Sequence, residues 1–288
     1  MPLNANPTIR QRRLARRLKE LRTAAGLTHA DAAAALGSAE SKVGRIENAQ
    51  SGVRLPDLRA LLDAYGVEDV DERAEIEKLA KEARQRGWWS RYSRIVDSTY
   101  AAYVAVEWDA SEIYTVESNL VPGLLQTTAY AEAVMRAQTP DLTDETIAGQ
   151  VEVRQQRRKV LQRGTPPRLW VVLAEAALHH EVGSRDIMRE QIEFLIEASR
   201  ETNIELQILP LGDPMNVCLF GSFVIMSFPG VAETDVVYTD LPTSTVYYED
   251  APEVDRYTQM FRRLNVAASS VERSRALLDK ALEKWCEQ

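Results

Sequence analysis

The chain has only two cysteines among its 288 residues, Cys218 and Cys286, and no run of 18 or more apolar residues. Two cysteines whose spacing suggests no pairing are typical of a reducing compartment. Without a long apolar run we expect no membrane span. The first 22 residues also lack the apolar segment that a secretion signal needs. We therefore expect a cytoplasmic, nucleoid-associated protein.

Residue patterns typical of catalytic, phosphate-binding and metal-binding sites are equally scarce. The chain has three histidines, and the two in its larger part, His179 and His180, are adjacent, so their side chains should point apart. It has no glycine-rich phosphate loop. Ser222 lies outside a G-x-S-x-G turn, and Cys218 has no histidine close to it in sequence. We therefore predict no catalytic residue, no metal, no cofactor and no enzyme.

Charge is unevenly distributed along the chain. The net charge is -8, yet the first 66 residues hold 11 Lys and Arg against six Asp and Glu. This segment carries +5, so the remainder carries -13. Phosphate is attracted to the first part and repelled by the second. Length and charge together predict two domains with different roles. With the helix pattern and the change of composition after Gly87, the boundaries are a basic domain over residues 1–70, a helical linker over 71–87 and a larger domain over 88–288.

The basic segment has the pattern of a short helical bundle. Leu14, Leu18 and Leu21 share one face of a helix predicted over residues 9–25, which Gly26 ends. Further helices are predicted over residues 29–37, 38–48, 56–65 and 69–86. The expected caps are Thr28, in a capping box with Asp31, and Ser38.

Residues 28–48 have the anatomy of a helix-turn-helix. Gly37 allows the sharp turn, and Val43 and Ile46 give the second helix a buried stripe. Small residues allow the first helix to approach its partner: Ala32, Ala33 and Ala35. Five residues of the second helix remain to face outward: Ala39, Glu40, Ser41, Lys42 and Arg45.

The stretch "LTHADAAAALGSAESKVGRIENAQS", with "LPDLRALLDAYGV" after it, resembles the five-helix DNA-binding domain of Xre and lambda/434-type repressors. The resemblance covers residues 10–70 and implies an operator in double-stranded DNA, bound by a homodimer. It also implies that Glu47 ties its helix to Arg17 or Arg22. The implied DNA contacts are Arg13, Arg17, Thr28, His29, Ser38, Ala39, Glu40, Ser41, Lys42, Arg45, Asn48 and Arg54.

The larger part of the chain predicts a mixed α/β domain, so the whole chain is predicted to be α+β. "RLWVVLAEAAL", "SRDIMREQIEFLIEASRET" and "IELQILPL" form a strand-helix-strand pattern. "SEIYTVESNLV" reads as a strand before them, and "GSFVIMSF", "DVVYTDL" and "STVYYED" as short antiparallel strands after them. Pro122 and Gly123 suit a type II turn. Aromatic residues are dense after residue 87 and read mainly as a core; a ligand pocket lined by Trp88, Trp89, Trp108 and Trp170 is the alternative.

A second resemblance covers residues 88–285. "YVAVEWDASEIY", "LVPGLLQTTAYAEAVM" and "LQILPL" are similar to the C-terminal domain of WhiJ-like Xre-type regulators of actinobacteria. The resemblance implies a transcriptional regulator, such as a repressor, whose C-terminal domain senses a ligand or a small protein encoded nearby. Two alternatives stay open: the DNA-binding, autoregulating half of a toxin-antitoxin-like module, and an enzyme domain tethered to DNA.

Overall fold

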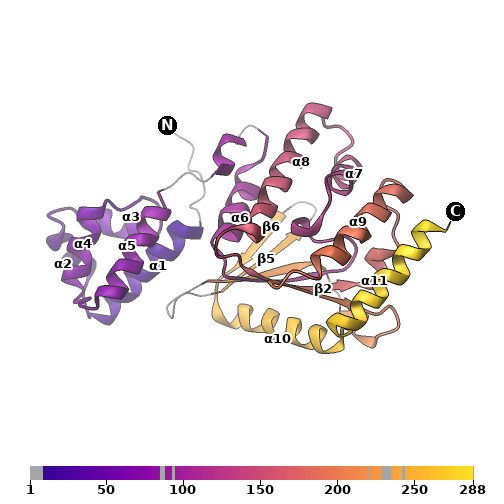
Figure 1. Cartoon of the computed structure of the whole chain (residues 1–288). Coiled ribbons are helices and arrows are strands. Elements are labelled where there is room, and N and C mark those ends of the chain that lie inside the picture. Colours follow the sequence, from indigo (N-terminus) through magenta and orange to yellow (C-terminus); the bar gives the residue numbers. More distant parts are fainter. Residues whose placement is uncertain are drawn as a thin grey trace. The chain divides into compact units, whose positions relative to one another are not determined.

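The computed structural model describes residues 9–84, 88–92, 95–218, 221–228, 235–241 and 244–287 (Figure 1). The chain divides into two units. The first comprises Met1–Ser93 with Asp97–Val106, and the second comprises Arg94–Val96 with Glu107–Gln288. The fold is α+β, as the sequence predicts. Within the described residues, no helix is both long enough and apolar enough to cross a membrane.

The first unit is built on a bundle of helices around one apolar core. Leu18, Val43, Leu58 and Leu61 are almost fully buried in it. The predicted stripes on the first and third helices are therefore confirmed. The bundle helices are α1 (Ile9–Ala24), α2 (His29–Ala35), α3 (Glu40–Glu47), α4 (Leu55–Ala64) and α5 (Val70–Glu82).

Helix α5 corrects the prediction of a helical linker over residues 71–87. Ile76 and Ala80 of α5 lie in the same core as α1 and α3. Arg59 of α4 makes two hydrogen bonds to Glu77 of α5, at 2.7 and 3.0 Å. The charged exposed face of α5 suggested a linker, but its narrow apolar stripe completes the bundle. Residues 85–87 of the predicted linker lie outside the described residues.

The turns on either side of α2 are mostly as predicted. Thr28 and Asp31 form a complete capping box, and Gly26 and Gly37 have positive φ angles of 70° and 55°. The predicted Ser38 cap is wrong. The helix begins one residue later than predicted, so Ala39 rather than Ser38 is the N-cap of α3. Ala39 supplies no side-chain hydrogen bond to the helix end.

The second unit is built on one six-stranded sheet in the order β3-β2-β1-β4-β5-β6. β1, β2 and β3 are parallel, while β4, β5 and β6 continue the sheet in antiparallel pairs. This confirms the predicted strand-helix-strand unit and the antiparallel strands after it. The strands are β1 (Glu112–Glu117), β2 (Arg168–Ala174), β3 (Ile204–Leu209), β4 (Phe223–Ser227), β5 (Val236–Leu241) and β6 (Ser244–Tyr248).

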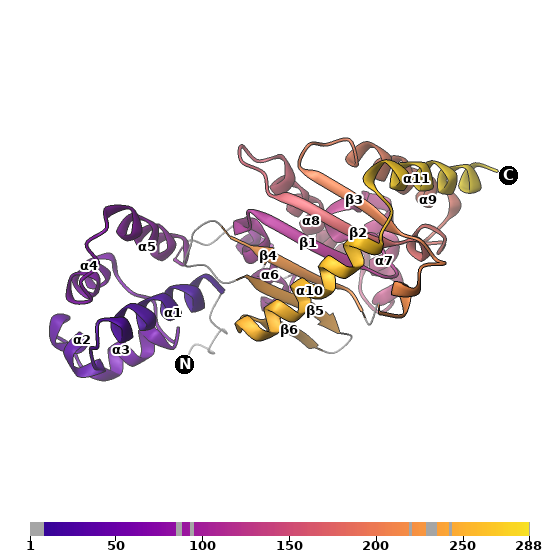
Figure 2. The same cartoon turned by 90° about the horizontal axis from the view of Figure 1, so that it is seen from below.

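Helices cover both faces of this sheet (Figures 1 and 2). α10 (Ala251–Ala267) crosses one face, where Phe261 and Leu264 share one buried core with Val116 and Ile225. The helices that complete the unit are α7 (Thr128–Gln138), α8 (Asp144–Arg158), α9 (Arg185–Ala198) and α11 (Val271–Cys286). The sequence missed one helix, α6 (Ser98–Asp109), because its residues are too uniformly apolar to show a stripe.

The connection from β1 to α7 corrects the predicted type II turn. Gly123 has no positive φ; it opens a short 3-10 helix, Gly123–Leu125. A Cβ at residue 123 would lie 3.4 Å from Nη1 of Arg157, whose guanidinium forms a buried ion pair with Glu107 (Nη2–Oε2, 2.6 Å). A side chain at residue 123 would thus come into van der Waals contact with this guanidinium. Gln191 then fixes the connection, accepting from the Thr127 N–H and donating to the Leu125 carbonyl, both at 2.8 Å.

Candidate nucleic-acid interface

Helix α3 separates its side chains sharply between core and surface. Val43 and Ile46 are buried, at 0% and 3% exposure. The residues at the start of the helix are exposed: Ala39, Glu40 and Ser41, with Arg45 one turn later. The predicted outward position of these four residues is confirmed, although their contact with DNA stays a prediction. In a docked helix-turn-helix, residues at this end of the second helix reach base edges.

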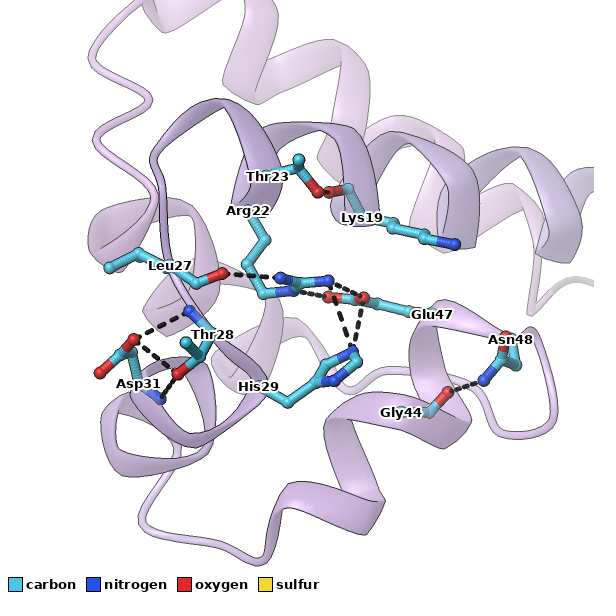
Figure 3. Close-up of polar contacts among 10 residues, drawn as sticks. All are labelled: Lys19, Arg22, Thr23, Leu27, Thr28, His29, Asp31, Gly44, Glu47 and Asn48. Atoms are coloured by element: carbon cyan, nitrogen blue, oxygen red, sulfur yellow. Dashed lines mark hydrogen bonds and ion pairs between the residues drawn. The ribbon is translucent and has the colours of Figure 1, made fainter.

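One buried polar cluster joins α1, α2 and α3 (Figure 3). Arg22 forms a bidentate ion pair with Glu47, with Nε–Oε1 at 2.8 Å and Nη2–Oε2 at 2.9 Å. Nε2 of His29 lies 3.0 Å from Oε2 of the same carboxylate. Arg22 also donates to the Leu27 carbonyl at 2.6 Å. Of the two arginines that the sequence left open as partners of Glu47, the structure selects Arg22. We call Arg22, His29 and Glu47 the α1–α3 hub.

The hub holds a charge in the interior. The Glu47 side chain is only 2% exposed. Burial works to raise the pKa of Glu47, but the hydrogen bonds from Arg22 and His29 outweigh it and lower this pKa below its ordinary value. Burial, together with the nearby Glu47 charge, raises the pKa of Tyr65 to about 12. The Arg22–Glu47 pair therefore stays ionised at neutral pH and ties α3 to α1.

Three residues predicted to contact phosphate have intramolecular roles. The Thr28 hydroxyl donates to Oδ2 of Asp31 at 2.7 Å and accepts from the Asp31 N–H. His29 lies on Glu47, although 46% of its side chain is exposed. Nδ2 of Asn48 donates to the Gly44 carbonyl at 2.8 Å. Thr28 and Asn48 thus cap helix ends, and His29 is a member of the hub.

Two of the predicted DNA-binding cations are ion-paired within the bundle. Arg17 pairs with Glu72 of α5, and Nζ of Lys42 lies 2.8 Å from Oδ2 of Asp57 on α4. The structure therefore does not place Lys42 with Ser41 and Arg45 as a free surface group. The prediction missed these pairs because both acids lie on helices that follow the helix-turn-helix in sequence.

Other basic residues keep exposed charges. Within the described part of the chain, Lys19, Arg45 and Arg54 are exposed and have no ion-pair partner. Lys19 was not among the predicted DNA contacts. It lies three residues before Arg22 on α1, a spacing that places both on one side of the helix. That spacing was the only signal for Lys19 in the sequence, and it needed Arg22 to be identified as the Glu47 partner first.

The remaining predicted contacts are less accessible. Arg13 is partly buried. The Ser38 hydroxyl is buried and has no hydrogen-bond partner among the described residues. It is therefore neither the predicted cap of α3 nor an exposed contact.

The four tryptophans proposed as a pocket lie in different places. Trp88 and Trp89 belong to the first unit, with ring centroids 5.9 Å apart. Trp108 and Trp170 belong to the second unit. Trp170 packs on Phe261 in the core beneath α10 and donates its indole N–H to Gln207 at 2.7 Å. Trp170 is thus a core residue rather than the wall of a common pocket.

His179, which follows strand β2, contacts Glu175 and Lys284. Its Nε2 lies 3.6 Å from Oε1 of Glu175, and its Nδ1 lies 3.4 Å from Nζ of Lys284. In the residues that the structure covers, three or more His, Cys, Asp or Glu side chains nowhere gather in a metal-binding arrangement.

Comparison with known families matches both parts of the chain. A family described as a helix-turn-helix domain matches residues 13–76. A family described as a domain of unknown function (DUF5753) matches residues 100–280, more than half of the chain. No curated protein matches the chain, and neither does any solved structure. The helix-turn-helix match spans the hub and the exposed start of α3.

Proposed function

We propose that this chain, which belongs to the DUF5753 family and carries an N-terminal helix-turn-helix domain, is a sequence-specific transcriptional regulator. In this proposal α3 enters the major groove of double-stranded DNA, with Ala39, Glu40, Ser41 and Arg45 toward the bases. Its relation to Xre-type repressors and to the WhiJ-like regulators stays a prediction, because the two family matches name only a helix-turn-helix domain and a domain of unknown function.

The observation that carries the proposal is the rigid presentation of an exposed α3. The α1–α3 hub ties both helices of the motif to α1 through Arg22, His29 and Glu47. Ser41 and Arg45 are exposed on the helix that the hub holds. Recognition of bases needs side chains held in fixed register, because each base pair presents its donors and acceptors at set positions in the major groove.

Charge supports the same orientation. Lys19, Arg45 and Arg54 have no internal partner among the described residues, so they can neutralise phosphates without first breaking an ion pair. Each phosphate neutralised releases counterions and adds affinity that falls with salt. The chain after residue 84, beyond α5, holds 20 Lys and Arg against 30 Asp and Glu. Its charge of -10 should be repelled by phosphate, which weakens nonspecific binding.

We further propose that the protein acts as a homodimer and that the DUF5753 domain senses a ligand or a small protein partner. A dimer would read two half-sites about 34 Å apart, a common solution for a module whose recognition helix is as short as α3. An acidic domain is complementary to a basic protein partner. Sensing would then consist of a change in how the two DNA-binding units are presented.

The test begins with selection of an operator from random double-stranded DNA by the full-length protein, followed by footprinting. We expect Arg45→Ala to weaken operator binding about tenfold or more, since a good base contact contributes about 1–3 kcal/mol. Arg59→Ala is the matched control, because Arg59 is also exposed but pairs with Glu77 on α5. Failure to select any sequence, or equal losses in both variants, would overturn α3 as the recognition helix.

A further inference from the structure

A cavity of about 460 Å³ lies beside α10 in the second unit. It is open to solvent on one side and is lined by residues before and at the start of β4, at the end of β5, on β6 and on α10. In Figure 2, α10 runs across this part of the sheet. The volume is within the range of small-molecule sites, roughly 300–1,000 Å³. Neither family match assigns a ligand to it, and none of the four tryptophans lines it.

Three aromatic rings form one wall of the cavity. The Tyr257 ring centroid lies 5.1 Å from that of Phe223 and 5.2 Å from that of Tyr248. Met260 continues the apolar wall along α10. The faces of aromatic rings carry partial negative charge and attract ammonium groups. Burial, followed by the hydrogen bond with Tyr248, raises the pKa of Tyr257 to about 12, so the Tyr257 hydroxyl remains neutral at physiological pH.

The charged side chains of the cavity have an acidic excess. Asp240, at the end of β5, and Glu253, in the first turn of α10, contribute two carboxylates, while Arg256 contributes one guanidinium. Glu253 is half-buried, whereas Asp240 and Arg256 are exposed. A partly buried carboxylate and aromatic rings that line the same cavity favour a cation over an anion, because both attract positive charge in a region of reduced dielectric constant.

We infer that this cavity binds a small organic cation, an amine or quaternary ammonium group attached to an apolar body. The ammonium group lies toward Glu253 and the aromatic wall, and the apolar body packs against Met260. Occupation of the cavity adds an effector to the proposed regulator. That consequence rests on the proposed function, whereas binding itself does not.

The test uses three indole compounds that share a ring system and differ in charge: tryptamine (cation), indole (neutral) and indole-3-acetate (anion). Their affinities for the full-length protein are measured by calorimetry and by ligand-detected NMR at pH 7. We expect tryptamine to bind at least tenfold more tightly than indole-3-acetate, with indole between them. Equal affinities, a preference for the anion, or no binding of tryptamine would each overturn the inference.

Variants locate the site. Met260→Trp fills the cavity and should abolish tryptamine binding, and Glu253→Gln should reduce the preference for tryptamine over indole to less than threefold. Glu272→Gln, an exposed acid on α11, is the matched control and should leave both affinities unchanged. If Met260→Trp retains wild-type binding, the cavity is not the site. A folded Met260→Trp protein is recognised by unchanged operator binding and unchanged circular dichroism.

The two proposals fail separately in these experiments. Tryptamine binding without selection of an operator would remove the regulator and leave the cation site. Operator selection without tryptamine binding would remove the cation site and leave the regulator.

Discussion

Nζ of Lys42 lies 2.8 Å from Oδ2 of Asp57, so a lysine of the proposed recognition helix is held by the first turn of α4. The pair is partly exposed, with 36% and 25% of the two side chains accessible. Pairs of this kind contribute at most about 1 kcal/mol. DNA can therefore compete for Lys42, but the lysine must leave Asp57 to reach a base or phosphate.

We expect Asp57→Asn to tighten operator binding about threefold, because it frees Lys42 and removes a negative charge near the DNA. Affinity is measured by fluorescence anisotropy at two salt concentrations. Asp63→Asn is the control, since Asp63 is also an acid of α4 but pairs with Arg73 of α5. An equal gain in both variants would mean that general charge, rather than release of Lys42, accounts for the effect.

The α1–α3 hub predicts a large effect on stability. Glu47→Gln leaves the Arg22 guanidinium, whose side chain is 11% exposed, without a charged partner. Breaking a buried pair from one side costs about 3–5 kcal/mol, and the remaining hydrogen bonds should keep the loss near the lower end. Hydrogen exchange of the α1–α3 amides in the full-length protein measures this loss locally. Arg17→Gln, which breaks the more exposed pair with Glu72, should cost less than about 1 kcal/mol.

The lowered pKa of Glu47 sets the pH range in which this stability is lost. The native state holds fewer protons at Glu47 than the unfolded state does, so the contribution is complete above the ordinary pKa of about 4.5. It is lost as the pH falls through the lowered pKa of the folded state. Protection of the α1–α3 amides should therefore decline more steeply below about pH 4.5 in the wild type than in Glu47→Gln. Parallel pH profiles for the two proteins would contradict this assignment.

Much of the bundle could be predicted because its signals are local in sequence. The Thr28–Asp31 capping box and the positive φ angles of Gly26 and Gly37 depend on a few neighbouring residues. The pairs Lys42–Asp57 and Arg17–Glu72 depend on the packing of helices far apart in the chain. Nothing in the sequence around Lys42 distinguishes a free lysine from a paired one, so the surface charge of the interface required the structure.

In the second unit, too, features local in sequence could be predicted and contacts between distant segments could not. The strands were predictable because each is a short apolar run between turn residues. Their order was not, because β1 lies between β2 and β4, which are both distant from it in sequence. The ion pair of Glu107 with Arg157, and its closeness to Gly123, could not be predicted either. Likewise, the cavity beside α10 combines residues from β4, β5, β6 and α10, and no single segment carries its signal.

Ala49 provides a test of backbone strain at the end of α3. It is the one non-glycine residue with positive φ (55°) among the described residues, and it follows the C-cap Asn48. The Gln50 N–H closes the helix end on the Arg45 carbonyl at 2.8 Å, an arrangement that favours glycine at residue 49.

Ala49→Gly should therefore stabilise the bundle by about 1 kcal/mol. Ala34→Gly, on the exposed side of α2, should instead destabilise it by about 0.5–1 kcal/mol. Chemical denaturation detects both, and a loss of stability in Ala49→Gly would contradict the strain.

Glu117 predicts a pH dependence of opposite sign in the second unit. It lies at the end of β1, where burial raises its pKa to about 7 against the opposing effects of a Ser222 hydrogen bond and the Arg154 charge. The native state here holds more protons than the unfolded state, so the contribution is complete below the ordinary pKa of about 4.5 and is lost as the pH rises through about 7.

Glu117→Gln should remove this dependence, because its amide has no proton to lose and keeps a hydrogen-bonding group beside Ser222. Between pH 5 and pH 8 the wild-type sheet should lose on the order of 2–3 kcal/mol relative to the variant. Hydrogen exchange of the β1 and β4 amides measures the difference. Glu190→Gln, an exposed acid of α9, should follow the wild-type profile. If Glu117→Gln also follows the wild-type profile, Glu117 is ionised at neutral pH and Arg154 outweighs its burial.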